Sequence, residues 1–221
     1  MILFALAAAL ASAQPAPAAP ACAAGPSGAV CRALAAGEAG KADVAAQEFE
    51  SLAATATGPE RDRALAAAGN MWIAAGQPGK AALALDRALA GTGLQAEQRG
   101  EALLDRARAA ESQNDLKLAR ARVTEATQTI GEDPFLWYFS AALAIREGKA
   151  EQAKIAIGKA LSLAPDEALV LFEAGHVYQF AGEPDKAKDY WTRAAAKEPD
   201  SPTGKAAKEA LALLEKPAAP K

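Results

Sequence analysis

Few residues of the sequence have the types and spacing that catalysis or metal binding requires. The 221 residues include a single histidine, His176, and two cysteines, so a zinc site or a catalytic triad would lack most of its groups. The adjacent carboxylates Glu132 and Asp133 stand in a Gly-Glu-Asp-Pro turn, where Asp133 is expected to cap the next helix. No phosphate-binding glycine loop, nucleophile elbow or His-Glu-x-x-His motif occurs. We therefore expect no enzymatic activity, no catalytic or metal-binding residue and no cofactor.

The two cysteines indicate a structural role. Cys22 and Cys31 are nine residues apart, which is not the Cys-x-x-Cys spacing of a redox motif. In an oxidising compartment two such residues favour a single disulfide, which would tie the chain before the first helix to that helix. The alternative is a half-buried Cys31 and a free Cys22.

The N-terminal residues are typical of an export signal. Residues 1–10 form the uncharged apolar run MILFALAAAL, and Ala11-Ser12-Ala13 follows as a cleavage site of the A-x-A type. This predicts a signal peptide over residues 1–13, a Pro/Ala-rich extended leader over 14–25, and export, which in a bacterium means the periplasm. No Lys or Arg precedes the apolar run, and a buried N-terminal helix is the alternative interpretation. No other segment is apolar over the ~18 residues of a membrane span, so we expect no integral membrane segment in the mature chain.

The composition favours helices throughout. Hydrophobic residues make up 51% of the chain but aromatic ones only 5%, because alanine supplies most of the apolar content. Alanine has the highest helix propensity, so a β-sandwich or β-barrel is excluded. The 24 basic and 27 acidic residues give a net charge of -3 without a basic stripe, so we expect no nucleic-acid partner.

The same pattern of residue types returns about every 34 positions. One column holds only small residues, which allow two helices to approach closely: Ala33, Gly69, Ala107, Ala141 and Gly175. A second column holds residues that tolerate the left-handed conformation at a helix end: Gly40, Gly76, Asn114, Gly148 and Gly182. A third is alanine in every unit: Ala45, Ala81, Ala119, Ala153 and Ala187. Larger apolar residues follow one turn later on the same face: Phe49, Leu85, Val123, Ile157 and Trp191.

These columns resemble the tetratricopeptide repeat, whose signature is W-x2-L-G-x2-Y, then A-x3-F, then P, on a period of 34. The segment 168–201 matches it best, with Gly175, Tyr178, Ala187 and Pro199 in their columns. Leu171, Ala174 and Trp191 replace the signature Trp, Leu and Phe. The resemblance covers about four-fifths of the chain.

The resemblance implies an all-α fold, a right-handed superhelical solenoid of about five helix pairs followed by a capping helix. The repeats are expected over residues 26–201, divided as 26–59, 62–95, 100–133, 134–167 and 168–201. Four extra residues between the second and third units are expected to form a longer loop or a lengthened helix. Ser201 and Pro202 are expected to open a capping helix over 202–215, and a Pro-rich tail follows over 216–221.

The resemblance also implies a binding groove, because the first helix of each tetratricopeptide unit lines the concave face. In the early units the groove-facing positions are polar or mixed: Arg63, Asn70, Ile73, Glu101, Leu104, Arg108 and Glu111. Aromatic residues gather in the last two units, so we expect the partner site at Phe135, Tyr138, Ile145, Phe172, His176 and Phe180. The alternative is that the aromatic residues pack between neighbouring units. The carboxylate clamp of some family members is not matched, since Leu104 with Arg108 and Phe172 with His176 occupy its positions.

We therefore expect a non-catalytic, exported adaptor that binds a partner protein or peptide in its concave groove, in cell-envelope assembly or cell-wall work. One alternative is a structural scaffold that oligomerises. Another is an accessory module of an envelope enzyme on a separate chain. The sequence defines neither the partner nor the oligomeric state.

Overall fold

A computed structural model describes residues 22–25 and 28–214. The predicted signal peptide over 1–13, most of the leader and the tail over 216–221 lie outside the described residues. The described part consists of helices joined by short connections, with no strand. The helices are α1 (Ala29–Glu38), α2 (Ala42–Thr55), α3 (Gly58–Ala74), α4 (Pro78–Ala90), α5 (Ala96–Ser112), α6 (Leu116–Ile130), α7 (Pro134–Arg146), α8 (Ala150–Leu163), α9 (Ala168–Phe180), α10 (Pro184–Lys197) and α11 (Pro202–Leu214).

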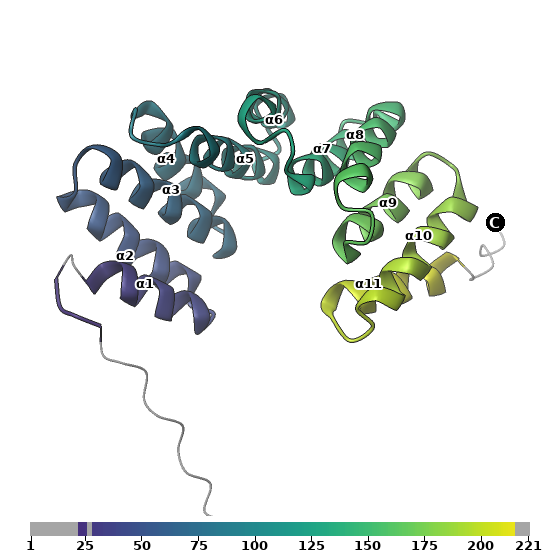
Figure 1. Ribbon diagram of the computed structural model, residues 1–221, viewed down its shortest axis with the longest axis horizontal. Coiled ribbons are helices and arrows are strands. Elements are labelled where there is room, and N and C mark those ends of the chain that lie inside the picture. Colours follow the sequence, from purple (N-terminus) through teal and green to yellow (C-terminus); the bar gives the residue numbers. More distant parts are fainter. Residues whose placement is uncertain (1–21, 26–27, 215–221) are drawn as a thin grey trace, which may run out of the picture.

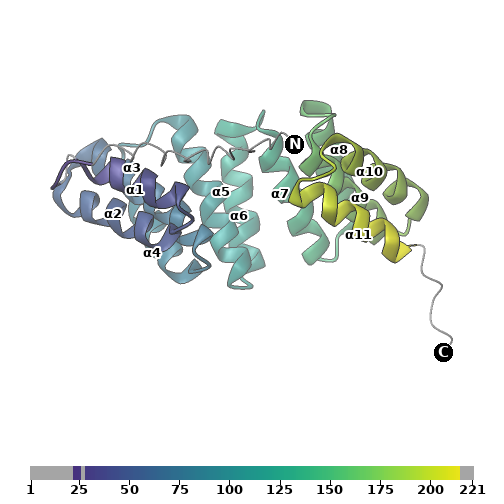
Figure 2. The same ribbon diagram turned by 90° about the horizontal axis from the view of Figure 1, so that it is seen from below.

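The helices form an arch of successive pairs. Each helix packs on the next one along the chain, and α3 also packs on α5 and α7 on α9. The inner side of the arch is lined by α3, α5, α7 and α9, whereas α4, α6 and α8 follow the outer side (Figure 1). Figure 2 looks into the arch from its open side, with α1 and α11 in front, toward the viewer. The all-α superhelical repeat fold predicted from the sequence is confirmed.

The turns between paired helices have one geometry in all the repeats. The predicted turn residues all have positive φ: Gly40 (71°), Gly76 (68°), Asn114 (63°), Gly148 (74°) and Gly182 (76°). The residue after each donates its N–H back to a carbonyl of the preceding helix, as Gln77 does to Trp72 at 2.9 Å. These are Schellman-type helix ends, which glycine, and asparagine next, adopt with least strain.

Small residues set the distance between the helices of a pair. The alanine column is fully buried, and a β-carbon added at Gly69 or Gly175 would lie within 3.0 Å of Leu85 or Trp191. The large side chains of the second helices therefore pack directly on the backbone of the first helices. Packing of this kind depends on small residues at the contact positions.

Two helices begin earlier than the predicted unit boundaries. α3 starts at Gly58, within the predicted first unit, because Pro59 fits the first helical turn. The extra residues between the second and third units lengthen α5, which starts at Ala96 after a capping box formed by Gln95 and Gln98. The loop between α4 and α5 is held by the buried carboxylate of Asp62 in α3, which accepts the N–H of Gly93 at 3.0 Å.

The last helix covers the end of the core. Ser201 accepts the N–H of Gly204 at 3.0 Å, as an N-cap does. Ala207 is buried, and Leu211 and Leu214 pack against the cluster around Trp191. The apolar stripe of α11 thus shields the final pair, while Leu213 on its other side is exposed.

Candidate functional site

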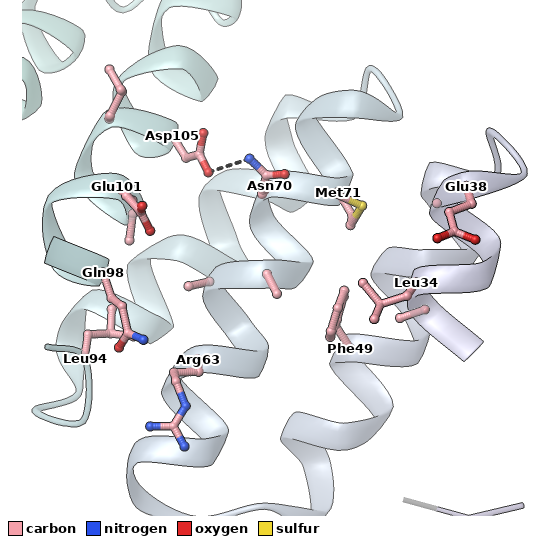
Figure 3. Close-up of a pocket in the computed structure, with 16 residues that line it drawn as sticks. Leu34, Glu38, Phe49, Arg63, Asn70, Met71, Leu94, Gln98, Glu101 and Asp105 are labelled. Atoms are coloured by element: carbon pink, nitrogen blue, oxygen red, sulfur yellow. Dashed lines mark hydrogen bonds between the residues drawn. The ribbon is translucent and has the colours of Figure 1, made fainter. Parts of the chain in front are cut away.

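One hollow of the described surface lies on the inner side of the N-terminal half, between α1, α3 and α5. It encloses about 730 Å³, and Phe49 of α2 belongs to its lining (Figure 3). Most of its lining is apolar, and the polar side chains stand around it. Its lining includes Leu34, Glu38, Phe49, Arg63, Asn70, Met71, Leu94, Gln98, Glu101 and Asp105.

Carboxylates crowd one wall of this N-terminal hollow. Asp105 accepts a hydrogen bond from Asn70 at 2.8 Å and forms an ion pair with Arg108 at 3.0 Å. Burial nevertheless raises the pKa of Asp105 above its ordinary value. The pKa of Glu101 is also raised, first by burial and then by the nearby carboxylates, Asp105 among them. Negative charge on this wall is therefore incompletely balanced.

A second hollow lies on the inner side of the C-terminal half, between the end of α5 and helices α7 and α9. It encloses about 430 Å³. Its lining consists of Glu111, Phe139, Ala142, Leu143, Ile145, Arg146, Glu173, His176, Gln179 and Phe180. Arg146 is held on the rim, because its guanidinium bonds to the Glu111 carboxylate and donates to Asn114 Oδ1 at 3.0 Å.

Glu173 is the unusual group of the C-terminal hollow. Only 7% of its surface is exposed, and no hydrogen bond or ion pair joins it to another described residue. Burial raises its pKa to about 8, since no cation compensates for the lost hydration of the carboxylate. The negative charge that Glu173 would carry raises the pKa of Tyr138 further, beyond the effect of burial. A buried carboxyl of this kind can exchange a proton or bind a cation near neutral pH.

The predicted partner residues fall into two groups. Ile145, His176 and Phe180 line the C-terminal hollow. Phe135, Tyr138 and Phe172 do not line either hollow: Phe135 is exposed, and Tyr138 and Phe172 are half-buried.

Phe172 and His176 also belong to the packing around Trp191. The Phe172 ring meets the His176 ring edge-on, with 4.5 Å between centroids, and His176 meets Trp191 in the same way at 5.3 Å. The Trp191 indole N–H donates to the Phe172 carbonyl at 3.0 Å. Burial lowers the pKa of His176, so the ring is neutral at neutral pH. The described structure therefore gives His176 both a wall position in the hollow and a packing role.

Several lining residues were not predicted from the sequence. Of the concave positions expected in the early units, Ile73 and Arg108 line neither hollow. The others line one of the two: Arg63, Asn70, Glu101, Leu104 and Glu111. The lining residues that the sequence did not predict include Leu34, Phe49 and Met71 in the N-terminal half and the buried Glu173 in the C-terminal half. Leu34 was missed because the first repeat matches the pattern only weakly. The cluster of aromatic residues led to a partner site predicted in the C-terminal half rather than in the N-terminal half.

Metal-binding and membrane-spanning features are both missing from the described part of the chain. Within residues 22–25 and 28–214, no group of three His, Cys, Asp or Glu side chains is arranged to hold a metal ion. Among the described helices, none combines the length and the apolar character needed to cross a bilayer.

Comparisons with known proteins agree with the repeat architecture. Residues 136–167 match the family model described as tetratricopeptide repeat. Among curated proteins, no sequence matches the chain. Residues 136–167 thus correspond to one tetratricopeptide repeat, and the described helices repeat the same paired arrangement on both sides of it.

Solved structures of similar fold include three other repeat proteins. MamA superposes with a TM-score of 0.60 at 19% identity, covering 87% of this chain and 96% of MamA. PilW, a "widely conserved type IV pilus biogenesis factor", gives 0.68 at 17%, covering 82% and 81%. YrrB, "a TPR protein with an unusual peptide-binding site", gives 0.57 at 16%, covering 82% and 90%. At these identities the likeness establishes the fold.

Proposed function

We propose that this protein is a non-catalytic binding protein that holds a polypeptide segment of a partner along its concave face. The observation that carries the proposal is the pair of largely apolar hollows on the inner side of the arch. Exposed apolar side chains such as Leu34 and Phe180 stand at these hollows and are available for contact. Apolar anchors in concave sites supply most of the binding free energy in protein interfaces.

The spacing of the hollows favours an extended or helical segment over a small molecule. They lie on successive inner helices, and Glu111 at the end of α5 borders the second while Asp105 borders the first. A polypeptide can place side chains in both at once, which a compact ligand cannot. YrrB, which has this fold, is described as having a peptide-binding site, and this supports the same mode here.

We also propose export and a role in cell-envelope assembly. The apolar run over residues 1–10 and the cleavage sequence after it support export. The disulfide between Cys22 and Cys31 suits an oxidising compartment. The likeness to PilW, a pilus biogenesis factor, supports an assembly role.

Photo-cross-linking in cells of the source organism tests the binding face. A benzophenone amino acid is placed at Leu34 or Phe180 on the inner side, or at Leu83 or Ile155 on α4 and α8. All four side chains are exposed, by 59%, 42%, 68% and 72%, so the outer positions are at least as accessible as the inner ones. We expect discrete polypeptide adducts from Leu34 and Phe180 and none from the outer positions.

Other adduct patterns would contradict the proposal. Equal adducts from both faces, or from the outer face alone, would place the partner elsewhere. Adducts made only of two copies of this chain would favour the oligomerising scaffold instead.

A further inference from the structure

The concave face combines apolar walls with carboxylates that lack partners. Glu38, Glu101 and Glu173 have no hydrogen bond or ion pair with other described residues. Among the described cations of the two linings, only Arg63 is equally free, because Arg146 is paired with Glu111. The face therefore has more acidic side chains without a partner than basic ones.

From this arrangement we infer that the partner segment carries Lys or Arg side chains between apolar ones, and that Glu173 receives one of these cations. The inference rests on the proposed function, since it specifies the partner chemistry of the same face. It differs from a general acidic surface because Glu173 is more than nine-tenths buried and lines the hollow itself.

The surroundings of Glu173 suit a long cationic side chain. Phe139, Ile145 and Phe180 supply apolar walls of the same hollow. The methylene stem of Lys or Arg packs well on such walls while its charged end reaches a carboxylate. A guanidinium can donate two parallel hydrogen bonds to the carboxylate, which here has no protein donor. A neutral side chain of the partner would leave the ionised Glu173 carboxylate without a counter-ion.

The other titratable and charged groups near Glu173 do not serve as its counter-ion. On α7, Tyr138 has a pKa raised above its ordinary value and stays neutral, and Arg146 is bound to Glu111. On α5, Arg108 is paired with Asp105. On its own helix, His176 is neutral because burial lowers its pKa. None of these groups provides Glu173 with an ion pair.

The arrangement makes binding depend on pH in a defined direction. In the free protein the buried Glu173 keeps its proton up to about pH 8. A Lys or Arg side chain of the partner binds the ionised carboxylate. Below about pH 8, binding therefore requires that Glu173 first release its proton. Affinity should therefore rise between about pH 6 and about pH 9, by up to about tenfold for each pH unit below the pKa. The neutral Tyr138 and His176 do not change charge over most of this range.

Panning of a display library of random linear peptides against the purified full chain tests the inference. Selected peptides are synthesised, and their dissociation constants are measured by fluorescence anisotropy with wild type, Glu173→Gln and Glu151→Gln. Glu151 is an exposed carboxylate of α8 on the outer side, paired with Lys154, and is the matched control. Circular dichroism verifies that each variant is folded, and Gln is nearly isosteric with Glu.

The expected result has three parts. Selected peptides are enriched in Lys or Arg flanked by apolar residues. Glu173→Gln weakens binding at about pH 9 by roughly tenfold or more and removes the rise of affinity with pH. Glu151→Gln leaves both properties unchanged.

Each other outcome has a distinct meaning. Peptides without an excess of Lys or Arg overturn the inference, as does an unchanged affinity in Glu173→Gln, while the proposed function stands. Failure to select any peptide that binds contradicts the proposed function, and this inference with it.

Discussion

The α-carbon of Gly175 lies against the indole ring of Trp191. A β-carbon at position 175 would come within 3.0 Å of the ring, and the Trp191 N–H donates to the Phe172 carbonyl on the same helix as Gly175. Trp191 is almost fully buried by this contact and by the capping helix α11. The contact therefore fixes the distance between α9 and α10, and with it the position of Glu173 on the inner side.

Gly175→Ala should destabilise the protein, whereas Gly158→Ala should stabilise it. The added methyl of Gly175→Ala overpacks the Trp191 contact, at a cost of roughly 1–3 kcal/mol. Gly158 lies within α8, and a β-carbon there would meet no neighbouring atom within 4 Å, so alanine gains about 0.5–1 kcal/mol of helix propensity. Urea unfolding followed by circular dichroism measures both. If both substitutions changed the free energy of unfolding in the same direction, the contact between Gly175 and Trp191 would not set the packing of α9 on α10.

Glu173 should make the stability of the protein fall as the pH rises from about 4.5 to about 8. Its pKa in the folded protein is above its ordinary value of 4.5, so the folded state binds more protons than the unfolded state across this window. Glu173→Gln removes the titrating group. We expect the variant to gain stability relative to wild type as the pH rises through the window, with the largest gain near its upper end. Urea unfolding midpoints of both proteins at about pH 5 and about pH 8 measure the difference. A stability difference that does not change with pH would contradict the burial of an uncompensated carboxylate.

Asn114 should tolerate glycine better than alanine. It holds the left-handed turn conformation that glycine holds in the other repeats, with φ of 63°. Alanine in this conformation costs about 1 kcal/mol more than glycine. The thermal midpoint of Asn114→Ala should therefore lie below that of Asn114→Gly. Gln113→Ala, at a neighbouring residue with φ of -87°, serves as the control and should stay close to wild type.

Cys22 and Cys31 should resist alkylation until a reductant is added. The disulfide joins their α-carbons across 5.7 Å, and Arg32 strengthens the connection by donating to the carbonyl of Ala23 at 2.7 Å. Mass spectrometry after iodoacetamide treatment in denaturant, with and without reductant, counts the labelled thiols. Labelling of both cysteines without reductant would contradict the disulfide in the native protein.

The sequence predicted the repeat architecture well because its columns follow local rules. Positive φ at Gly148 or Asn114 and close packing at Gly175 depend on residue type at a fixed spacing, so the pattern shows them directly. The N-cap of α7 by Asp133 is equally local, with its carboxylate accepting the N–H of Phe135 at 2.8 Å.

The candidate site could be predicted only in part. Whether Phe172 lines a groove or packs on Trp191 depends on the angle between neighbouring pairs, which the sequence pattern does not encode. The isolation of Glu173 is likewise tertiary, because it depends on which side chains of α5 and α7 fail to reach it. The hollow around Met71 arises from three helices whose relative placement no single repeat determines.

Binding of the cross-linked partner to matched surface variants tests the central claim most directly. Leu34→Gln and Phe180→Gln alter the inner side, and Leu83→Gln and Ile155→Gln alter the outer side at exposed positions. Isothermal titration calorimetry with the purified partner gives the dissociation constant of each. Loss of an interface anchor costs about 2 kcal/mol, so we predict about thirtyfold weaker binding for each inner variant and unchanged binding for the outer ones. Unchanged affinity in both inner variants, or an equal loss in the outer ones, would contradict binding on the concave face.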